Sequence, residues 1–205
     1  MTFSIVARDP ANGDFGVAVS TARCAVGARC PFTRARIGAV ATQARVNTLL
    51  GLQGLALLEQ GLDAQMALGR LLESDEGRDV RQVQLVDSTG RTAAHTGAET
   101  VPWAGHLLLD QFAVAGNMLT GPEVLAAMAD AFSRSTGPLW DRLAAALQAG
   151  QDAGGDKRGR QSAALVVARD DPFPLVDIRV DDHPDPVPEL RRILGLYVAQ
   201  WAPSP

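Results

Sequence analysis

Residues 154–162, GGDKRGRQS, combine residue types that bind anions. The segment carries three cations, Lys157, Arg158 and Arg160, among glycines that leave backbone N–H groups accessible. Guanidinium groups and accessible backbone N–H groups both bind carboxylates and phosphates. The Gly-x-x-x-x-Gly-Lys-Ser/Thr spacing of a Walker loop is absent, so the pattern predicts a small-anion site of another kind.

Three polar residues of the same segment extend this candidate site. Asp156 has the chemistry to orient an arginine or to act as a base. Gln161 and Ser162 stand at the start of a predicted strand, where their side chains can face a cleft. We therefore expect the segment to bind a substrate, with Asp156 in a catalytic role. The alternative is an exposed connection between two elements.

Two amides at predicted strand ends form a second candidate. Asn117 follows Gly116 near the end of an apolar run, and Gln43 ends an earlier one. An amide N–H held at such a place stabilises an oxyanion. We expect Asn117 to contribute to catalysis and Gln43 to the binding of substrate. The alternative is a turn residue that satisfies its own backbone.

A metal-dependent hydrolase is a further alternative, because Asp181, Asp182 and His183 are consecutive and have metal-ligating side chains. Neighbours on an extended segment point in opposite directions, however, and aspartates before a helix favour capping. Cys24 and Cys30 have no second pair with which to complete a zinc site. We expect two reduced thiols, with a catalytic cysteine as the alternative, and neither a metal nor a cofactor.

Composition excludes several classes of protein. Of 205 residues, 46% are hydrophobic and 20% are charged, which suits a folded domain with a sizeable core. The net charge of −4 lacks the basic excess typical of nucleic-acid binding. No apolar run is long enough to cross a bilayer, and the amino terminus lacks the pattern of a signal peptide. We expect a cytoplasmic protein that contacts neither nucleic acid nor membrane.

The elements that must position these residues alternate between strands and helices. Asn12-Gly13 favours a hairpin between the first two strands, and the alternation in residues 80–86 predicts a half-buried strand. Predicted strands cover residues 3–8, 15–20, 36–43, 80–86, 91–95, 112–119, 161–168 and 175–180, and predicted helices cover 49–58, 63–72, 121–132, 139–147 and 186–201. Two stacked sheets capped by helices satisfy this order, and so does one mixed sheet with helices on both sides. Residues 1–205 are expected to form one domain.

Several segments together resemble a known family. They are residues 2–10 (TFSIVARDP), 16–20 (GVAVS), 38–44 (GAVATQA), 116–117 (GN), 121–122 (GP), 154–165 and 179–184 (RVDDHP). The chain is similar over residues 2–195 to family 1028 of the domains of unknown function, which is classed as Ntn-hydrolase-like. The resemblance implies an α/β (α+β) fold, a four-layer αββα sandwich of two mainly antiparallel sheets flanked by helices. It implies no established reaction.

An Ntn-like fold directs attention to Thr2. In Ntn hydrolases the first residue of the mature chain supplies the nucleophile, and its own α-amine serves as the base. Removal of Met1 would place Thr2 in that position, whereas a retained Met1 blocks the amine. Arg36 is expected to replace the lysine that usually lowers the pKa of the amine. The usual acid after the second strand is absent, since Ser20 and Thr21 stand there.

These observations predict a hydrolase that cleaves an amide or related C–N bond in a small anionic molecule. A non-catalytic ligand-binding or assembly protein on the same fold is the alternative. An apolar stripe at the carboxyl end, including Tyr197 and Trp201, indicates either packing on the same domain or a homo-oligomer, with a dimer expected.

Overall fold

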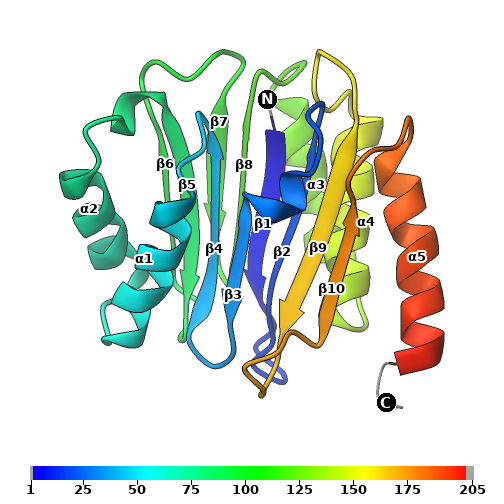
Figure 1. Cartoon of the computed structure of the whole chain (residues 1–205), viewed down its shortest axis with the longest axis horizontal. Helices are drawn as coiled ribbons and strands as arrows, with labels where there is room; N and C mark the ends of the chain where they lie inside the picture. Colours follow the sequence, from blue (N-terminus) through cyan, green and yellow to red (C-terminus); the bar gives the residue numbers. More distant parts are fainter. Residues whose placement is uncertain (1, 202–205) are drawn as a thin grey trace.

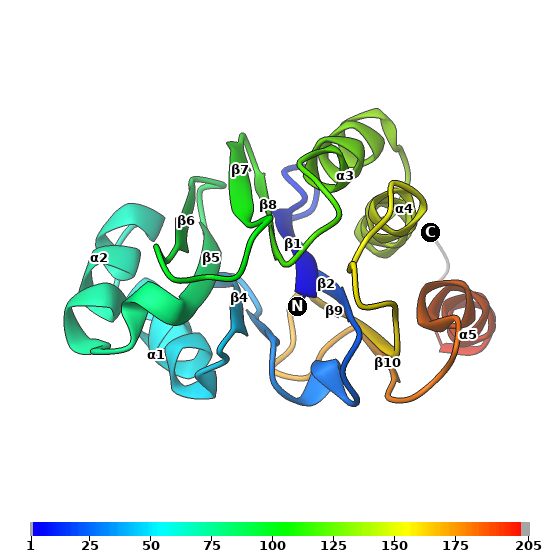
Figure 2. The same cartoon turned by 90° about the horizontal axis from the view of Figure 1, so that it is seen from above.

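The computed structural model describes residues 2–201, which form two antiparallel sheets stacked face to face (Figures 1 and 2). The six-stranded sheet has the spatial order β10 (Val176–Val180), β9 (Ser162–Ala168), β2 (Phe15–Thr21), β1 (Thr2–Arg8), β8 (Phe112–Asn117) and β7 (Gly105–Leu109). The four-stranded sheet has the order β3 (Pro31–Arg34), β4 (Gly38–Ala44), β5 (Arg81–Asp87) and β6 (Thr92–Thr96).

Helices cover the outer face of each sheet. The four-stranded sheet is covered by α1 (Thr48–Glu59) and α2 (Ala64–Ser74), and the six-stranded sheet by α3 (Glu123–Arg134), α4 (Leu139–Asp152) and α5 (Pro186–Trp201) (Figure 2). Two short 3₁₀ helices, η1 (Val26–Ala28) and η2 (Arg78–Val80), lie in loops. The four-layer αββα sandwich is confirmed, and the alternative of one mixed sheet is wrong.

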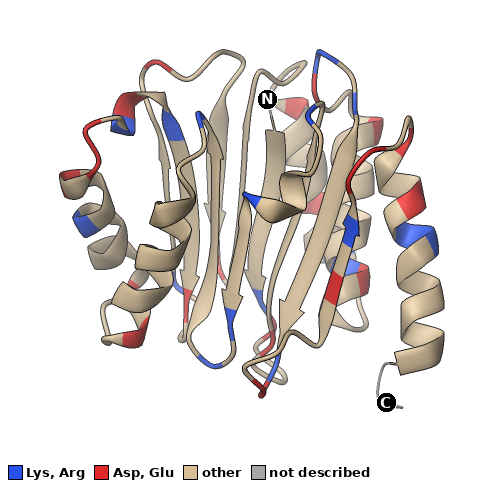
Figure 3. Cartoon of the chain, viewed as in Figure 1, with Lys and Arg blue, Asp and Glu red and all other residues tan. Residues whose placement is uncertain are grey.

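The apolar residues of β1 show how the strand order produces these layers. Phe3 and Ile5 point toward α3 and α4, whereas Val6 points between the two sheets. A strand that is covered on both faces needs apolar residues at successive positions, which its sequence supplies. Charged residues are accordingly sparse on the strands and frequent in loops and helices (Figure 3).

The strand β5 differs from its predicted form. Its sequence alternates polar and apolar residues and predicted one face in water, but both faces are buried. Val83 and Leu85 pack under α1 and α2. Gln82 and Gln84 face the other sheet, where the amide of Gln84 donates to the hydroxyl of Ser4 at 2.8 Å. The polar face of the pattern therefore marks a buried hydrogen-bonded layer.

Most other elements agree with prediction to within a few residues. Asp63 caps α2, with its carboxylate accepting from the N–H of Met66 at 2.8 Å. Two edge strands, β3 and β7, were not predicted, since edge strands bury little apolar surface. No helix within residues 2–201 combines the length and the apolar character needed to span a bilayer.

The strand pairing gathers several strand ends at one end of the sandwich. Thr2, which begins β1, is the register partner of Asn117 at the end of β8, and Phe3 pairs with Ser20 near the end of β2. In the facing sheet, the last residue of β4, Ala44, pairs with the first residue of β5. The amino terminus lies at this end, at the top of Figure 1.

Candidate functional site

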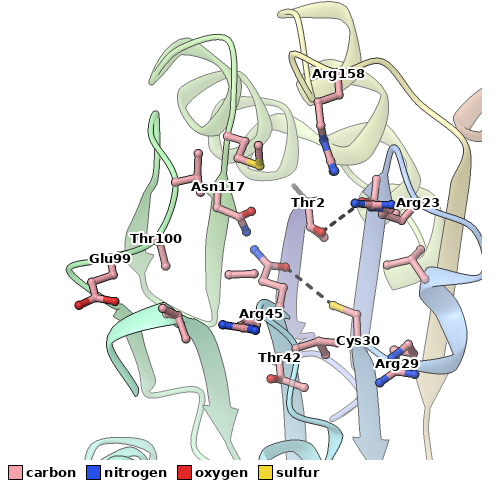
Figure 4. Close-up of a pocket in the computed structure, with 18 of the residues that line it drawn as sticks. Thr2, Arg23, Arg29, Cys30, Thr42, Arg45, Glu99, Thr100, Asn117 and Arg158 are labelled. Carbon is pink, nitrogen blue, oxygen red and sulfur yellow. Dashed lines mark hydrogen bonds between the residues drawn. The ribbon is translucent and has the colours of Figure 1, made fainter. Parts of the chain in front are cut away.

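A pocket of about 560 Å³ opens where these strand ends meet. Its wall includes Thr2, Thr21, Gln43 and Asn117 from strand ends, together with residues of the loops that follow β2, β4 and β6 (Figure 4). The volume falls within the range of small-molecule sites. The pocket is therefore the place to test each residue that the sequence singled out.

Thr2 lies in the wall of the pocket with only 7% of its surface exposed. Its hydroxyl donates to the hydroxyl of Thr21 across the β1–β2 pair at 3.2 Å (Figure 4). Thr21 is the last residue of β2, at the place where Ntn hydrolases usually have an acidic residue. It supplies a hydroxyl group in place of a carboxylate. The side chain of Thr2 is thus held by a neutral neighbour at the boundary between core and pocket.

The two predicted amides lie in the same wall and are joined through Gln82 of β5. The amide N–H groups of Asn117 and Gln43 both donate to Oε1 of Gln82, at 3.0 and 2.8 Å. The Nε2 group of Gln82 faces three acceptors: the carbonyls of Gly105 and Gly116 and the hydroxyl of Thr96. Because Nε2 donates to these acceptors, Oε1 of Gln82 is the end of the amide that points toward Asn117 and Gln43.

Gln82 therefore sets the orientation of Asn117, since its oxygen can only accept. One N–H of Asn117 is committed to that oxygen, and a second N–H remains on the same nitrogen. No acceptor within residues 2–201 is assigned to this second N–H. Asn117 thus holds a donor and an acceptor oxygen beside the strand that begins with Thr2.

A second part of the polar layer lies deeper. Ser4 donates to Oε1 of Gln43 at 2.6 Å, and Cys30 lies 3.8 Å from the same oxygen. Burial raises the pKa of the Cys30 thiol to about 12. Cys30 is thus a neutral thiol at physiological pH, which makes it a poor nucleophile. Cys24 also lines the pocket, but it is exposed.

The basic segment reaches the pocket through one side chain. Arg158 lines the pocket, and its guanidinium lies 3.2 Å from the carboxylate of Asp156. The buried Asp156 carboxylate also accepts from the backbone N–H groups of Ala22 and Arg158 at 3.0 and 2.8 Å. Asp156 therefore ties the basic segment to the end of β2 and orients Arg158.

The other residues of the segment point elsewhere. Lys157 donates to the carbonyl of Pro102, Arg160 pairs with Asp185 at 3.1 Å, and Gln161 donates to Asp182. The hydroxyl of Ser162 donates to the carbonyl of Arg23 and accepts from the N–H of Val26. Lys157, Arg160, Gln161 and Ser162 thus shape the walls around the pocket and do not line it.

Arg36 lies away from Thr2, contrary to the position expected for it. It precedes β4, whereas the pocket is at the other end of that strand. Its exposed guanidinium pairs with Asp170 at 3.2 Å. The sequence assigned Arg36 to the right strand but to the wrong end of it.

Three arginines that the sequence analysis did not select do line the pocket: Arg23, Arg29 and Arg45. Arg23 follows β2, Arg45 follows β4, and Arg29 follows η1. For Arg23 and Arg45 the available signal was a cation two or three residues after a predicted strand; Arg29 follows no predicted strand.

The structure does not bring together a metal site. No group of three or more His, Cys, Asp and Glu side chains within residues 2–201 is arranged to hold a metal ion. His183 accepts through Nδ1 from the N–H of Asp185 at 2.9 Å, and Asp182 accepts from Gln161. These contacts belong to the loop that leads into α5.

Comparison with known proteins assigns the chain to a protein family. The family model described as "Family of unknown function (DUF1028)" matches residues 2–190, and the chain belongs to that family. The resemblance seen in the sequence is thereby confirmed. Among the curated proteins, none matches this chain.

Several solved structures are similar to this chain. Protein SPO2555 from Silicibacter pomeroyi, of the same family, is 35% identical, with a TM-score of 0.91 over 98% of this chain and 89% of that one. Anbu (ancestral beta-subunit) from Yersinia bercovieri is 12% identical with a TM-score of 0.41, over 99% of each chain. An Anbu (Gly-1) mutant from Hyphomicrobium sp. strain MC1 is 11% identical with a TM-score of 0.48, over 98% of this chain and 96% of that one.

Proposed function

We propose that the protein hydrolyses an amide or related C–N bond in a small anionic molecule, with Thr2 as its nucleophile. The observation that carries this proposal is the position of Thr2, at the start of β1 and in the wall of a cationic pocket. Removal of Met1 would make the α-amine of Thr2 available as a base. An amine with a pKa near neutrality takes the hydroxyl proton readily.

The reaction would proceed in two steps. Oγ1 of Thr2 attacks the carbonyl carbon while the α-amine takes the hydroxyl proton and delivers it to the leaving nitrogen. The C–N bond breaks and leaves an ester on Thr2. Water then hydrolyses this ester, which releases a carboxylic acid and restores the hydroxyl. The second N–H of Asn117 would stabilise the oxyanion in each step, and Arg23 and Arg158 would favour the neutral amine.

Intact mass and turnover test this proposal together. We expect the untagged protein to lack Met1 and to cleave at least one member of a panel of anionic small amides. Thr2→Ala should lower turnover about 10³-fold or more, as loss of a nucleophile does elsewhere, and Thr2→Ser should retain part of it. Thr33→Ala, a threonine on the distant strand β3, is the matched control. Retained Met1, or equal turnover in Thr2→Ala, would refute the nucleophile.

One observation favours a second candidate, a ligand-binding protein without catalysis. The hydroxyl of Thr2 contacts a neutral hydroxyl, Thr21, where an acid was sought. In this case Met1 is retained, and small anions bind without being altered. Quantitative recovery of a bound ligand, together with retained Met1, would support this candidate over the hydrolase.

We also propose that the protein is a cytoplasmic homo-oligomer, with a dimer as the simplest form. Tyr197 packs on its own domain and donates to the carbonyl of Leu175, so it does not support an interface. Trp201 and two leucines of α1, Leu49 and Leu52, are each more than half exposed. Light scattering of the wild type and of Leu52→Glu tests this proposal. A monomer at all concentrations would contradict it.

A further inference from the structure

The pocket concentrates positive charge in an acidic protein. Four arginines line it, Arg23, Arg29, Arg45 and Arg158, whereas the chain as a whole has a net charge of −4. Glu99 is the one carboxylate that lines the pocket among the described residues. Such an excess raises the local concentration of anions and stabilises them when bound.

Three of these arginines lack an internal counterion. No ion pair joins the side chains of Arg23, Arg29 or Arg45 to an acid within residues 2–201, while most arginines outside the pocket are paired. Like charges that face one pocket without counterions repel one another. A bound anion would remove this repulsion, which makes an anion the ligand that the pocket fits.

The first pair of arginines belongs to the six-stranded sheet. Arg158 is oriented by Asp156, whose carboxylate also accepts from the N–H of Ala22, next to Arg23. The carbonyl of Arg23 accepts from the hydroxyl of Ser162. These contacts hold the loop after β2 against the loop before β9. Figure 4 shows both arginines on the Thr2 side of the pocket.

The other two arginines, Arg29 and Arg45, lie apart from each other. The N–H of Arg45 donates to the carbonyl of Val80, and Arg81 donates to the carbonyl of Arg45. Arg29 follows η1, which contacts β2 and β9, and it precedes Cys30, whose carbonyl accepts from the N–H of Thr42 on β4. Figure 4 shows Arg45 and Arg29 on either side of Thr42 and Cys30.

We propose that the ligand is a dianion with one terminal oxyanion group bound by Arg23 and Arg158 and the other bound by Arg45. The lining of the pocket also includes the apolar side chains of Val26, Val80 and Met118. A single small anion would neutralise the arginines on one side only, whereas an apolar chain between two anionic groups matches both the separated arginines and the apolar part of the wall. This inference rests on the proposed function for its reaction, since the bond cleaved would lie near Thr2. The binding of a dianion by the pocket does not depend on that reaction.

Calorimetry with α,ω-dicarboxylates of increasing length, from succinate to suberate, tests the dianion. We expect one length to bind about tenfold or more tightly than the monocarboxylate of equal length. Phosphonocarboxylates of the same lengths form a second arm. A stronger response in that arm supports the dianion and assigns one of its groups as a phosphate.

Two variants locate the binding groups. Arg45→Gln and Arg23→Gln should each reduce the affinity for the preferred dianion to that for the monoanion. Arg70→Gln, on the outer helix α2, is the control and should change neither affinity. Thermal unfolding of Arg23→Gln and Arg45→Gln should not fall below the wild-type temperature, since neither arginine has an ion pair within residues 2–201 to lose. Arg70→Gln should lower it only slightly, since the pair of Arg70 with Glu73 is exposed.

The outcomes separate this inference from the proposed function. Binding of the dianion by Thr2→Ala, with no turnover by the wild type, supports the inference and refutes the hydrolase. Equal affinity for monoanions and dianions, no binding of any dianion, or an Arg45→Gln variant that binds dianions like the wild type would overturn the inference. Turnover of a monoanionic amide could still be observed in that case.

Discussion

Two hollows on the same sandwich differ in how their arginines are neutralised. The pocket beside Thr2 has a volume of about 560 Å³ and three arginines without an internal counterion. A larger groove of about 830 Å³ lies at the other end of β4, and there Arg34 pairs with Glu59 and Arg36 with Asp170. In the larger groove, three arginines are balanced by three carboxylates, Glu59, Asp170 and Asp177, and two of the arginines form ion pairs. Among the described residues that line the smaller pocket, four arginines face one carboxylate, so positive charge remains for a ligand.

This difference teaches that volume alone does not identify the site. Charges paired within the protein contribute modestly to stability at the surface. Arg23, Arg29 and Arg45 are exposed to solvent and have no ion pair within residues 2–201, so their guanidinium groups are available to bind an anion. The pocket differs in a second respect, because a buried layer of hydrogen-bonded amides supports its floor.

The largest expected effect on stability comes from a change in this layer of hydrogen-bonded amides. Gln82→Met would remove a donor from the buried carbonyl of Gly116 and the partly buried carbonyl of Gly105, and it would release Asn117 and Gln43. We expect it to lower the free energy of unfolding by about 3 kcal/mol, since each buried polar group left unsatisfied costs ~1–3 kcal/mol. Urea denaturation measures the change.

Gln84→Met on the same strand is the matched control for this prediction. Gln84 donates one hydrogen bond, to Ser4, and its Oε1 is buried with no partner among the described residues. Methionine removes that unsatisfied oxygen along with the bond, so the loss should stay below about 1.5 kcal/mol. Equal losses in the two variants would show that Gln82 is not the centre of the layer.

A smaller effect separates the ion pairs of the two hollows. Asp156→Asn weakens a carboxylate that is almost fully buried and that holds Arg158 and the end of β2. We expect a loss of about 1–2 kcal/mol in stability, because hydrogen bonds to a buried charge are worth more than neutral ones. Asp170→Asn breaks the exposed pair with Arg36 and should cost less than about 0.5 kcal/mol.

The same two variants should also differ in binding. Asp156→Asn releases Arg158 and should weaken the binding of anions, whereas Asp170→Asn should leave it unchanged. Calorimetry with the preferred anion measures both. If Asp170→Asn were the more damaging variant in either assay, the assignment of the two hollows would have to be reversed.

The sequence predicted the layers better than it predicted the site. Apolar runs and turn residues were enough to order the elements, because each reflects local burial and local backbone geometry. The contacts of Gln82 could not be predicted in this way. Its polar–apolar alternation indicated a solvated face, and only the stacking of the second sheet turned that face into a buried layer.

The arginines of the pocket illustrate the same limit. Arg36 was selected as a cation on the predicted strand 36–43, which it begins, and Arg45 was overlooked although it follows β4 directly. Which end of β4 lies beside Thr2 depends on the pairing of β1 with β8 and on how the two sheets face each other. Those are long-range relations that spacing along one segment does not encode.

The smallest expected effect tests the comparison of the two hollows most directly. In the ligand-free protein, Arg29→Gln removes one of several cations that repel one another, so stability should stay equal to the wild type or rise slightly. Arg34→Gln removes one partner of the pair with Glu59 and should lower stability by about 0.5 kcal/mol. The two variants delete the same charge from the same chain, so any global effect of net charge cancels between them. Urea denaturation at low ionic strength, repeated at high salt, measures the difference, and screening should reduce it. An equal loss in both variants would mean that Arg29 has an internal counterion in solution, and the charge left for a ligand would then be smaller than the structure indicates.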